Sequence, residues 1–508
     1  MRKLLCVLAL LAAVTGASPV YADWREARTD HFILTIDSSE EEARDFATRL
    51  ERFDAALRLL YGVEDSADQR ARPIAIYALQ EEPFMFACGC PGTLGKYVPR
   101  VESSFIFSMH APKADKKAKI GGWSSQALLL HEYSHHFMYS HFPVAYPFWF
   151  SEGFAEFNAN TSFEPDGSLI IGYPANYRAE GVANGISMKK LLDPQHYGFD
   201  DNPDVIYGRG WLLTHYLMLD PTRRGQLSNY LAAMNRGVPS VTAAQNAFGD
   251  LDKLNDELEA YRKGQLLAPF HIPAGKAPIK VTLRTLSPGE AAMVPLHALV
   301  MDGFNRSYRL RVALDVAKVA DRYRDDAVVQ GQQAETEYLA ERLDQADAAA
   351  DRALQLRPDL IEGFDVKGQI AVARLTRAKS TDAAAWTAAR AWFLKANRVN
   401  PNAVMPLYLY YSSFVAAKAK PTPGAINALR RAVVLAPESS AVRMALARQT
   451  LLDGNAADAR TLLQPVAFTP HRARDKNVPR DVLDLIDAGK IDEAKALIDG
   501  KDKDDDED

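Results

Sequence analysis

The chain has 508 residues, of which 47% are hydrophobic and 25% charged, and its formal net charge is −5. This length exceeds what one hydrophobic core usually organises, so we expect two or three domains. The composition is typical of a soluble globular protein and excludes a disordered or membrane-embedded one. The slightly acidic balance gives no electrostatic reason to expect a nucleic-acid partner.

The first residues predict an export signal. Arg2 and Lys3 precede an apolar run over residues 4–14, and Val20 and Ala22 place small residues at a cleavage site. That run is shorter than the roughly 20 apolar residues needed to span a bilayer. We therefore expect residues 1–22 to be removed as a signal peptide. The mature chain, with no integral membrane segment, would be periplasmic or secreted.

Two cysteines, Cys88 and Cys90, remain after removal of the signal. An oxidising compartment permits a disulfide, although a bridge across one residue is strained. Two thiolates at this spacing also suit metal binding or redox chemistry. Because nothing nearby completes a metal set, we interpret the segment as a turn, with or without a local bridge.

The N-terminal part predicts a mixed α and β lobe. Residues 31–36, 73–79 and 103–109 are rich in the residue types that favour strands. Between the first two, Ser38 and Ser39 begin a capping-box pattern, and apolar residues then recur at helical spacing up to about Gly62.

The next part predicts a helical lobe. A helix is expected over about residues 124–140, followed by further helices over residues 212–219, 224–234 and 251–263. Over residues 268–310 prolines recur, and apolar residues at 279, 281 and 283 alternate with polar ones, which predicts a small β-rich connector.

The C-terminal third is repetitive. Equivalent alanines recur at intervals of 43, 36, 34 and 35 residues, at Ala346, Ala389, Ala425, Ala459 and Ala494. In the first three units a second alanine follows after seven residues and a proline after five more; the last two units have Gly454 and Gly489 before the marker. Small residues at fixed places allow paired helices to approach closely, and proline ends the second helix. Residues 311–500 thus resemble tetratricopeptide repeats, which bind peptides or partner proteins in many families. A stabilising appendage is an equal alternative.

A metal-binding motif lies in the predicted helix over residues 124–140. His131 and His135 are four residues apart, so they share one helix face and can direct imidazole nitrogens at one metal ion. Glu132 is placed to reach a water on that metal without occupying a coordination position, as a catalytic base would.

Two downstream glutamates complete the pattern. A catalytic zinc needs a third protein ligand and an open position. Glu152, seventeen residues after His135, can supply that ligand if the chain returns as a second helix after Pro147. Glu156 lies on the same face as Glu152 and is suited to accept the free N–H of a ligand histidine.

With these residues the sequence resembles the gluzincin metallopeptidases, which pair His-Glu-x-x-His with a downstream glutamate. The segment Trp149–Ala155 is similar to the Trp-x-x-Glu-Gly-x-Ala stretch of the aminopeptidase N-like branch. A third stretch, Val205–Trp211, is similar to one in that branch whose tyrosine stabilises the oxyanion. The resemblance implies that role for Tyr207 and places Arg209 at the stretch's basic position. It also implies an α+β, thermolysin-like zincin domain.

The chain departs from that branch in two ways. The gap between His135 and Glu152 is slightly shorter, and no Gly-x-Met-Glu-Asn sequence precedes the motif to anchor a substrate amine. Glu102 is a weak candidate for that anchor. The choice between endopeptidase and exopeptidase action therefore remains open.

The sequence thus predicts a signal peptide (1–22), a gluzincin-like catalytic domain of mixed sheet and helical lobes (23–267), a β-rich connector (268–310), an all-α tetratricopeptide-like solenoid (311–500) and an acidic tail (501–508). The expected function is hydrolysis of peptide or protein substrates with one Zn²⁺, with a protein partner at the repeats. One alternative is a catalytically silent repeat scaffold with a metal-binding lobe. Another is a zinc hydrolase that acts on a different bond.

Overall fold

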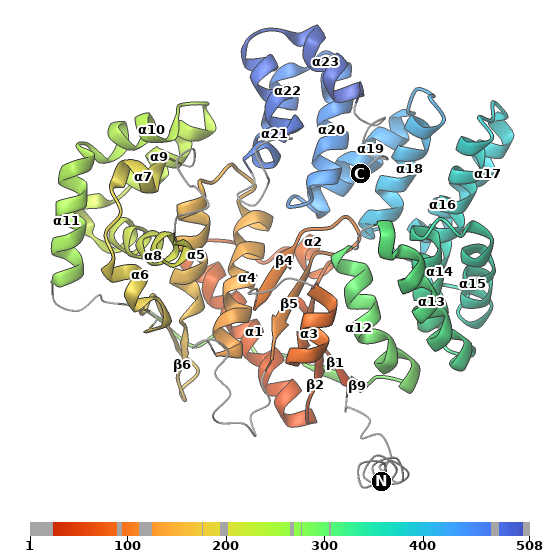
Figure 1. Ribbon diagram of the computed structural model, residues 1–508, viewed down its shortest axis with the longest axis horizontal. Helices are drawn as coiled ribbons and strands as arrows, with labels where there is room; N and C mark the ends of the chain where they lie inside the picture. Colours follow the sequence, from red (N-terminus) through yellow and green to blue (C-terminus); the bar gives the residue numbers. More distant parts are fainter. Residues whose placement is uncertain are drawn as a thin grey trace, which may run out of the picture.

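The computed structural model describes residues 24–88, 94–110, 124–174, 176–193, 202–264, 269–275, 277–303, 306–468 and 477–500. The expected signal peptide, Cys90 and the acidic tail lie outside these residues, as does the side chain of Cys88. The described chain is mostly helical with a small mixed sheet, and its C-terminal third is an arc of paired helices (Figure 1). Among the described helices, none combines the length and the apolar character needed to cross a membrane.

A six-stranded mixed sheet forms the N-terminal lobe. In spatial order its strands are β4 (Gly95–Val98), β5 (Phe105–Met109), β3 (Ile74–Leu79), β2 (Phe32–Asp37), β1 (Trp24–Arg28) and β9 (Thr282–Thr285). β5, β3 and β2 are mutually parallel, whereas β4, β1 and β9 each pair antiparallel with their neighbours. The apolar runs predicted over 31–36, 73–79 and 103–109 form the three parallel central strands, which are buried on both faces.

Helices cover both faces of this sheet. Helices α1 (Glu40–Tyr61) and α4 (Ser125–His141) share a hydrophobic core with Ile106, while Phe105 and Phe107 pack on the opposite face with α3 (Glu81–Cys88) and α12 (Pro288–Asp302). Alternate residues of β5 therefore belong to different cores, as the pleat of a strand requires. Helix α1 begins and ends as its sequence predicts, with Ser39 as N-cap and Gly62 in the left-handed conformation after the last turn.

The second lobe is helical. It contains α5 (Phe148–Ala159), α6 (Ala179–Ala183), α7 (Met188–Leu192), α8 (Pro203–Leu219), α9 (Gln226–Asn235), α10 (Ser240–Phe248) and α11 (Leu251–Lys263). A small antiparallel sheet of β6 (Ser162–Phe163), β7 (Leu169–Ile171) and β8 (Phe270–Ile272) lies beside α5. The helices predicted over 124–140 and 251–263 correspond to α4 and α11, and the one predicted over 212–219 is the second half of α8.

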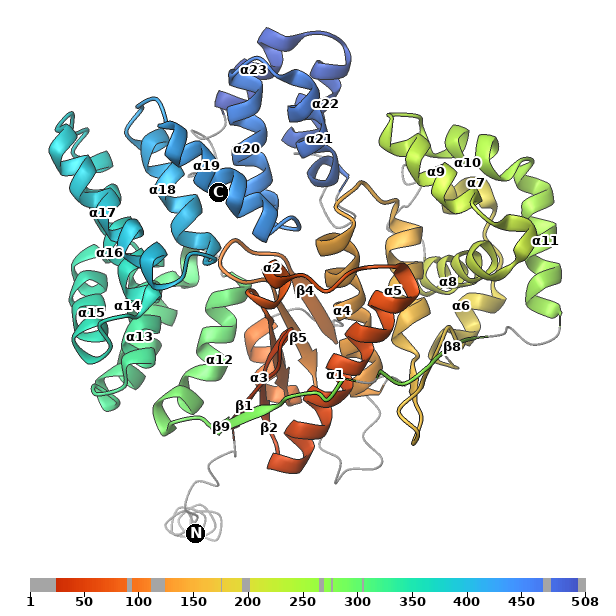
Figure 2. The same ribbon diagram turned by 180° about the vertical axis from the view of Figure 1, so that it is seen from behind.

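The expected connector over residues 268–310 is divided among larger units. Its strands β8 and β9 complete two different sheets, since β8 pairs with β7 and β9 pairs with β1 (Figure 2). Most of the remaining segment is α12, which begins at a capping box formed by Ser287 and Glu290 and packs on α3. The sheet lobe therefore includes residues up to about 302.

The C-terminal third consists of antiparallel helix pairs. They are α14 (Ala327–Leu339) with α15 (Leu343–Leu356), α16 (Ile361–Arg377) with α17 (Ala383–Val399), α18 (Val404–Ala416) with α19 (Pro423–Leu435), α20 (Ser440–Leu452) with α21 (Ala456–Ala467), and α22 (Val478–Asp487) with α23 (Ile491–Gly500), all preceded by α13 (Arg306–Arg322). The five marker alanines are buried at equivalent places on the second helix of each pair. This arrangement fits a tetratricopeptide-like solenoid.

The solenoid docks against the sheet lobe through a buried carboxylate. Glu438, in the turn between α19 and α20, accepts hydrogen bonds from Arg72 Nη1 at 2.5 Å and Ser104 Oγ at 2.7 Å. Arg431 on α19 adds a bidentate pair with Asp68, with both distances 2.7 Å. Because Glu438 is buried with its charge paired, separating the two units would remove the partners of that charge.

Close packing of α5 against α8 brings the predicted metal ligands together. A Cβ atom at Gly153 would lie 2.4 Å from the carbonyl oxygen of Gly210, and one at Gly210 would lie 2.5 Å from the carbonyl oxygen of Trp149. Both obstacles are backbone atoms, which cannot rotate away as a side chain would. The glycine that follows Glu152 in the sequence motif therefore allows the helix crossing that positions Glu152.

We expect Gly153→Ala to lower the free energy of unfolding by roughly 1–3 kcal/mol, the usual range for an overpacked core, despite the better helix propensity of alanine. Thermal unfolding of the full chain measures the effect. Gly185→Ala is the matched control, because a Cβ there meets nothing within 4 Å. Equal melting temperatures for the two variants would contradict this account of the α5–α8 crossing.

Candidate metal centre

Three potential metal-binding side chains converge between α4 and α5. His131 and His135 lie one turn apart on α4, and Glu152 faces them from α5. Nε2 of His131 lies 3.2 Å from Nε2 of His135, and Glu152 Oε2 lies 3.4 Å and 3.6 Å from these two nitrogens. The three residues are buried, with Glu152 only 1% exposed. The structure thus brings together the three residues predicted as ligands.

This donor set fits zinc in both spacing and chemistry. Ligand bonds of about 2.0–2.2 Å in a tetrahedron place neighbouring donor atoms about 3.3–3.5 Å apart. The three separations, 3.2, 3.4 and 3.6 Å, lie at or close to that range. Two imidazoles and one carboxylate also leave a fourth position open, as catalytic rather than structural zinc sites do.

The charges around the triad favour a cation. Burial acts to lower the pKa of His131, but its hydrogen bond with Glu152 and the charges of Glu156 and Glu132 outweigh burial and raise the pKa to about 8. Three carboxylates therefore surround two histidines in a largely buried site, and a positive charge among them offsets the cost of their burial.

Further polar side chains surround the triad. Ser151 Oγ lies 3.4 Å from Nδ1 of His135 and 2.8 Å from the hydroxyl of Tyr139. Glu156 Oε1 lies 3.6 Å from Nδ1 of His131, beyond hydrogen-bond distance. The same oxygen accepts hydrogen bonds from Arg178, at 2.9 Å from Nε and 2.8 Å from Nη2. Glu156 therefore lies next to His131, but its closest partner is Arg178 and not the histidine N–H that the sequence predicted.

Glu132 is held beside the triad by strand β4. Its Oε2 accepts a hydrogen bond from the backbone N–H of Tyr97 at 2.8 Å. A Cβ atom at Gly95, two residues earlier on β4, would lie 2.9 Å from Glu132 Oε1. Glycine at position 95 thus leaves room for the carboxylate against the strand. The sequence did not single out Gly95, Tyr97, Ser151 or Arg178.

Tyr207 lies at the same site. Its ring stacks on His131 with ring centroids 6.2 Å apart, and the Arg178 guanidinium lies 4.5 Å from the centre of the Tyr207 ring. Burial, followed by the charge of Glu152, raises the pKa of Tyr207 well above its usual value. The hydroxyl therefore keeps its proton at neutral pH and can act as a hydrogen-bond donor.

Arg209 and Glu102 lie elsewhere. Arg209 is fully buried and pairs with Glu259 on α11, so it joins two helices of the helical lobe. Glu102 follows β4 and lines cavities at the boundary between the sheet lobe and the solenoid. His136 packs against Tyr97 and Tyr133, and burial lowers its pKa to about 4.

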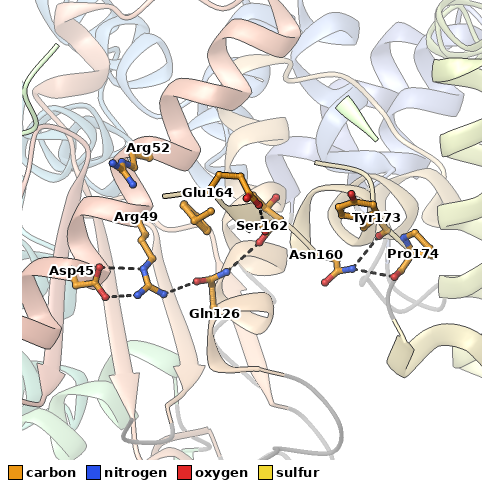
Figure 3. Close-up of a pocket in the computed structure, with 11 residues that line it drawn as sticks. Asp45, Arg49, Arg52, Gln126, Asn160, Ser162, Glu164, Tyr173 and Pro174 are labelled. Carbon is orange, nitrogen blue, oxygen red and sulfur yellow. Dashed lines mark hydrogen bonds and ion pairs between the residues drawn. The ribbon is translucent and has the colours of Figure 1, made fainter. Parts of the chain in front are cut away.

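A cavity of about 730 Å³ near the start of α4 contains none of the triad residues (Figure 3). Several of its polar groups are paired: Arg49 donates to Gln126 Oε1 at 2.9 Å and also pairs with Asp45, and Gln126 Nε2 donates to the carbonyl oxygen of Thr161 at 3.3 Å. These bonds join α1, α4 and the segment after α5. They help to fix the relative positions of α4 and α5, which carry the triad.

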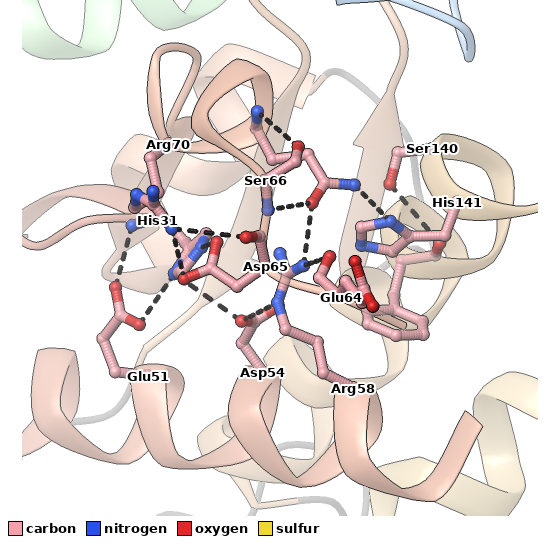
Figure 4. A network of polar contacts seen from close by, with 12 residues as sticks. His31, Glu51, Asp54, Arg58, Glu64, Asp65, Ser66, Arg70, Ser140 and His141 are labelled. Carbon is pink, nitrogen blue, oxygen red and sulfur yellow. Dashed lines mark hydrogen bonds and ion pairs between the residues drawn. The ribbon is translucent and has the colours of Figure 1, made fainter. Parts of the chain in front are cut away.

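A second group that could hold a metal, His31, Glu51 and Asp54, forms an ion network instead (Figure 4). His31 Nδ1 lies 2.9 Å from Glu51 Oε2. Asp54 accepts hydrogen bonds from Arg58 Nε at 2.6 Å and from the Tyr133 hydroxyl at 2.5 Å. The cations of His31 and Arg58 already neutralise these carboxylates. Because Tyr133 on α4 is the neighbour of Glu132, the network supports α4 behind the triad.

Comparisons with known proteins identify no family for this chain. No family model matches the chain, and no curated protein matches it. Among solved structures, the crystal structure of the yeast Tom70 is similar over 63% of this chain and 68% of that chain, with 13% identity and a TM-score of 0.26. A TM-score this low supports no inference about function.

The His31 network predicts a loss of stability at alkaline pH. Burial acts to lower the pKa of His31, but Glu51 and Asp54 outweigh burial and raise it to about 9. Since this folded-state pKa exceeds the unfolded value of about 6.5, the stabilisation is full below pH 6.5 and disappears as the pH rises through 9. It amounts to about 3 kcal/mol.

Melting temperatures measured from pH 6 to pH 10 test this prediction. We expect a steeper decline for the wild type than for His31→Gln, which cannot take up the proton. Parallel curves for the two proteins would show that His31 is not the titrating group.

Proposed function

We propose that this protein is a zinc-dependent hydrolase that cleaves peptide bonds, with His131, His135 and Glu152 as metal ligands and Glu132 as general base. The observation that carries the proposal is the tetrahedral spacing of three buried donor atoms, with a fourth side chain, Glu132, held beside them by β4. A structural zinc site needs ligands but has no use for an adjacent base.

The chain's own groups have distinct tasks. A bound zinc ion supplies a Lewis acid that lowers the pKa of water and polarises the scissile carbonyl. Glu132 takes the proton of the attacking water and returns it to the leaving nitrogen. Its hydrogen bond from Tyr97 N–H fixes one carboxylate oxygen and leaves the other to handle the proton. The Tyr207 hydroxyl, protonated at neutral pH, is suited to donate to the oxyanion.

The position of β4 supports a peptide substrate. β4 is an edge strand of the sheet, and no described strand pairs with its outer side. The N–H of Tyr97 points from that side to Glu132. An extended peptide can hydrogen-bond to such an edge, which would bring its backbone beside the proposed base. The resemblance to gluzincin peptidases agrees with this substrate class, and the predicted signal peptide would place the activity outside the cytoplasm.

A repeat-based binding role is the second candidate. A cavity of about 1670 Å³ lies between the sheet lobe and the solenoid, large enough for a segment of polypeptide. In a binding protein with a catalytically silent metal lobe, this cavity would be the only functional site. In a peptidase, the same cavity could recruit substrate.

We expect the purified chain to contain one zinc ion and His131→Ala to lose it, because two donors hold zinc weakly. Elemental analysis after dialysis measures the stoichiometry. His271→Ala is the matched control, since His271 is exposed on β8 and belongs to neither potential metal group. Loss of zinc from the control, or its retention by His131→Ala, would refute the proposed ligand set.

Glu132→Gln should keep zinc and fold but reduce hydrolysis by about 10²–10⁴-fold, the usual contribution of a general base. Mass spectrometry of a peptide library incubated with wild type or variant measures cleavage and reads specificity. An undiminished rate in the variant would exclude Glu132 as the base. Zinc-loaded wild type that cleaves esters but no peptide would indicate a different bond, and no cleavage at all would favour the binding role.

A further inference from the structure

The cavity between the sheet lobe and the solenoid is open to a ligand much larger than a metal ion. It is bounded by the loop after β4 on one side and by α14, α16, α18 and α20 on the other. Its wall includes apolar and aromatic side chains, among them Met405, Tyr408 and Met444. A second cavity, of about 650 Å³, adjoins the same boundary near β9 and α12.

Carboxylates are concentrated where the two cavities meet. Glu102 from the sheet lobe, Glu335 from α14 and Glu362 from α16 line both cavities. Asp365, one turn after Glu362 on α16, lines the larger one. Glu102 and Glu362 are exposed, whereas Asp365 is buried. Desolvation by the surrounding chain, and then the charges of Glu335, Glu362 and Asp365, raise the pKa of Glu102 above its usual value. The sheet lobe and the solenoid thus both contribute carboxyl groups to the boundary between the two cavities.

Asp365 gives an independent indication of a ligand. It is only 6% exposed, and its Oδ1 has no hydrogen-bond partner among the described residues. A buried carboxyl oxygen without a hydrogen-bond partner is destabilising, and burial, followed by the charge of Glu362, raises the pKa of Asp365 well above its usual value. A donor that enters the cavity would supply the missing partner.

Cations also line the two cavities: Lys418, Lys420 and Arg448 line the larger one, and Arg448 pairs with Asp499. His297 lies 3.7 Å from Glu335, Arg100 acts on Glu102, and Arg357 lines the smaller cavity. Arg284, which also lines the smaller cavity, is paired with Glu26 and Glu290. Among the described residues, only the triad and the His31 group have three donors close enough together for one metal ion. The ligand that fits is therefore an organic cation.

We propose that the cavity binds an extended polypeptide segment and that a lysine or arginine of this segment occupies the site formed by Glu102, Glu335, Glu362 and Asp365. The apolar wall of the cavity suits the rest of such a segment. The wall is longer than a small polyamine, and a polyamine would leave its Tyr and Met side chains uncovered. The site is composite, because Glu102 belongs to the sheet lobe and the other three belong to the solenoid.

The position of Glu102 links this site to the proposed active site. Glu102 lies five residues after Tyr97, whose N–H binds Glu132, and the intervening chain follows β4. A segment bound at Glu102 would thus enter beside the strand that passes the triad. The binding proposal itself requires neither zinc nor hydrolysis.

Fluorescence anisotropy with the full-length Glu132→Gln chain tests binding without cleavage. The probe is a labelled peptide of about twelve residues with two lysines, compared with the same peptide carrying glutamate at those positions. We expect the lysine peptide to bind at least about tenfold more tightly, equivalent to about 1.4 kcal/mol. We expect a further loss of at least tenfold when Glu335→Gln and Glu362→Gln are added to the chain.

The matched control adds Asp344→Asn and Asp351→Asn, which change the net charge equally but line neither cavity. Asp344 is 90% exposed on its side chain. The control should bind the lysine peptide as the parent does. Equal binding of the two peptides, an equal effect of the two double variants, or displacement of the peptide by spermine at matched charge concentration would overturn the proposal.

Discussion

The close approach of α5 to α8 is the constraint on which the candidate site depends. Glycines at positions 153 and 210 place the two backbones in direct contact. Glu152 precedes the first of these glycines and faces α4, while Tyr207 lies one turn before the second. A wider crossing would move Glu152 and Tyr207 away from the two histidines together. The helical lobe thus acts on the site through backbone sterics, and the ion network of His31 acts on it from the other side of α4.

The sequence predicted best those features that are local in the chain. His131 and His135 share one helical turn, so their convergence follows from helix geometry alone. Glu152 required only a helical return. Arg178 could not be predicted, because it lies in a short 3₁₀ segment and reaches Glu156 through tertiary folding. Strand β4 also escaped prediction, since four residues that begin with glycine and lysine lack a strand pattern.

The repeats show a similar division. The buried alanines and the terminal prolines correctly indicated helix pairs, because helix packing requires small residues at fixed positions. The sequence did not predict that every pair has the same turn geometry. Gly454 and Gly489 have positive φ, and Glu341, Lys379 and Lys418 adopt the same left-handed region in the first three units. The docking contact of Glu438 with Arg72 joins residues 366 positions apart, beyond the reach of any local pattern.

The pairing of β9 with β1 has a consequence for how the chain is made. Synthesis is vectorial, and β1 is among the first described segments to emerge, whereas β9 follows after the whole helical lobe. Until residue 285 is available, β1 keeps an open backbone edge that can pair with other chains. A nascent chain that stalls within the helical lobe would therefore be exposed to misassembly at its N-terminal strand. Expression of the sheet and helical lobes without the solenoid would need to include β9 to close that edge.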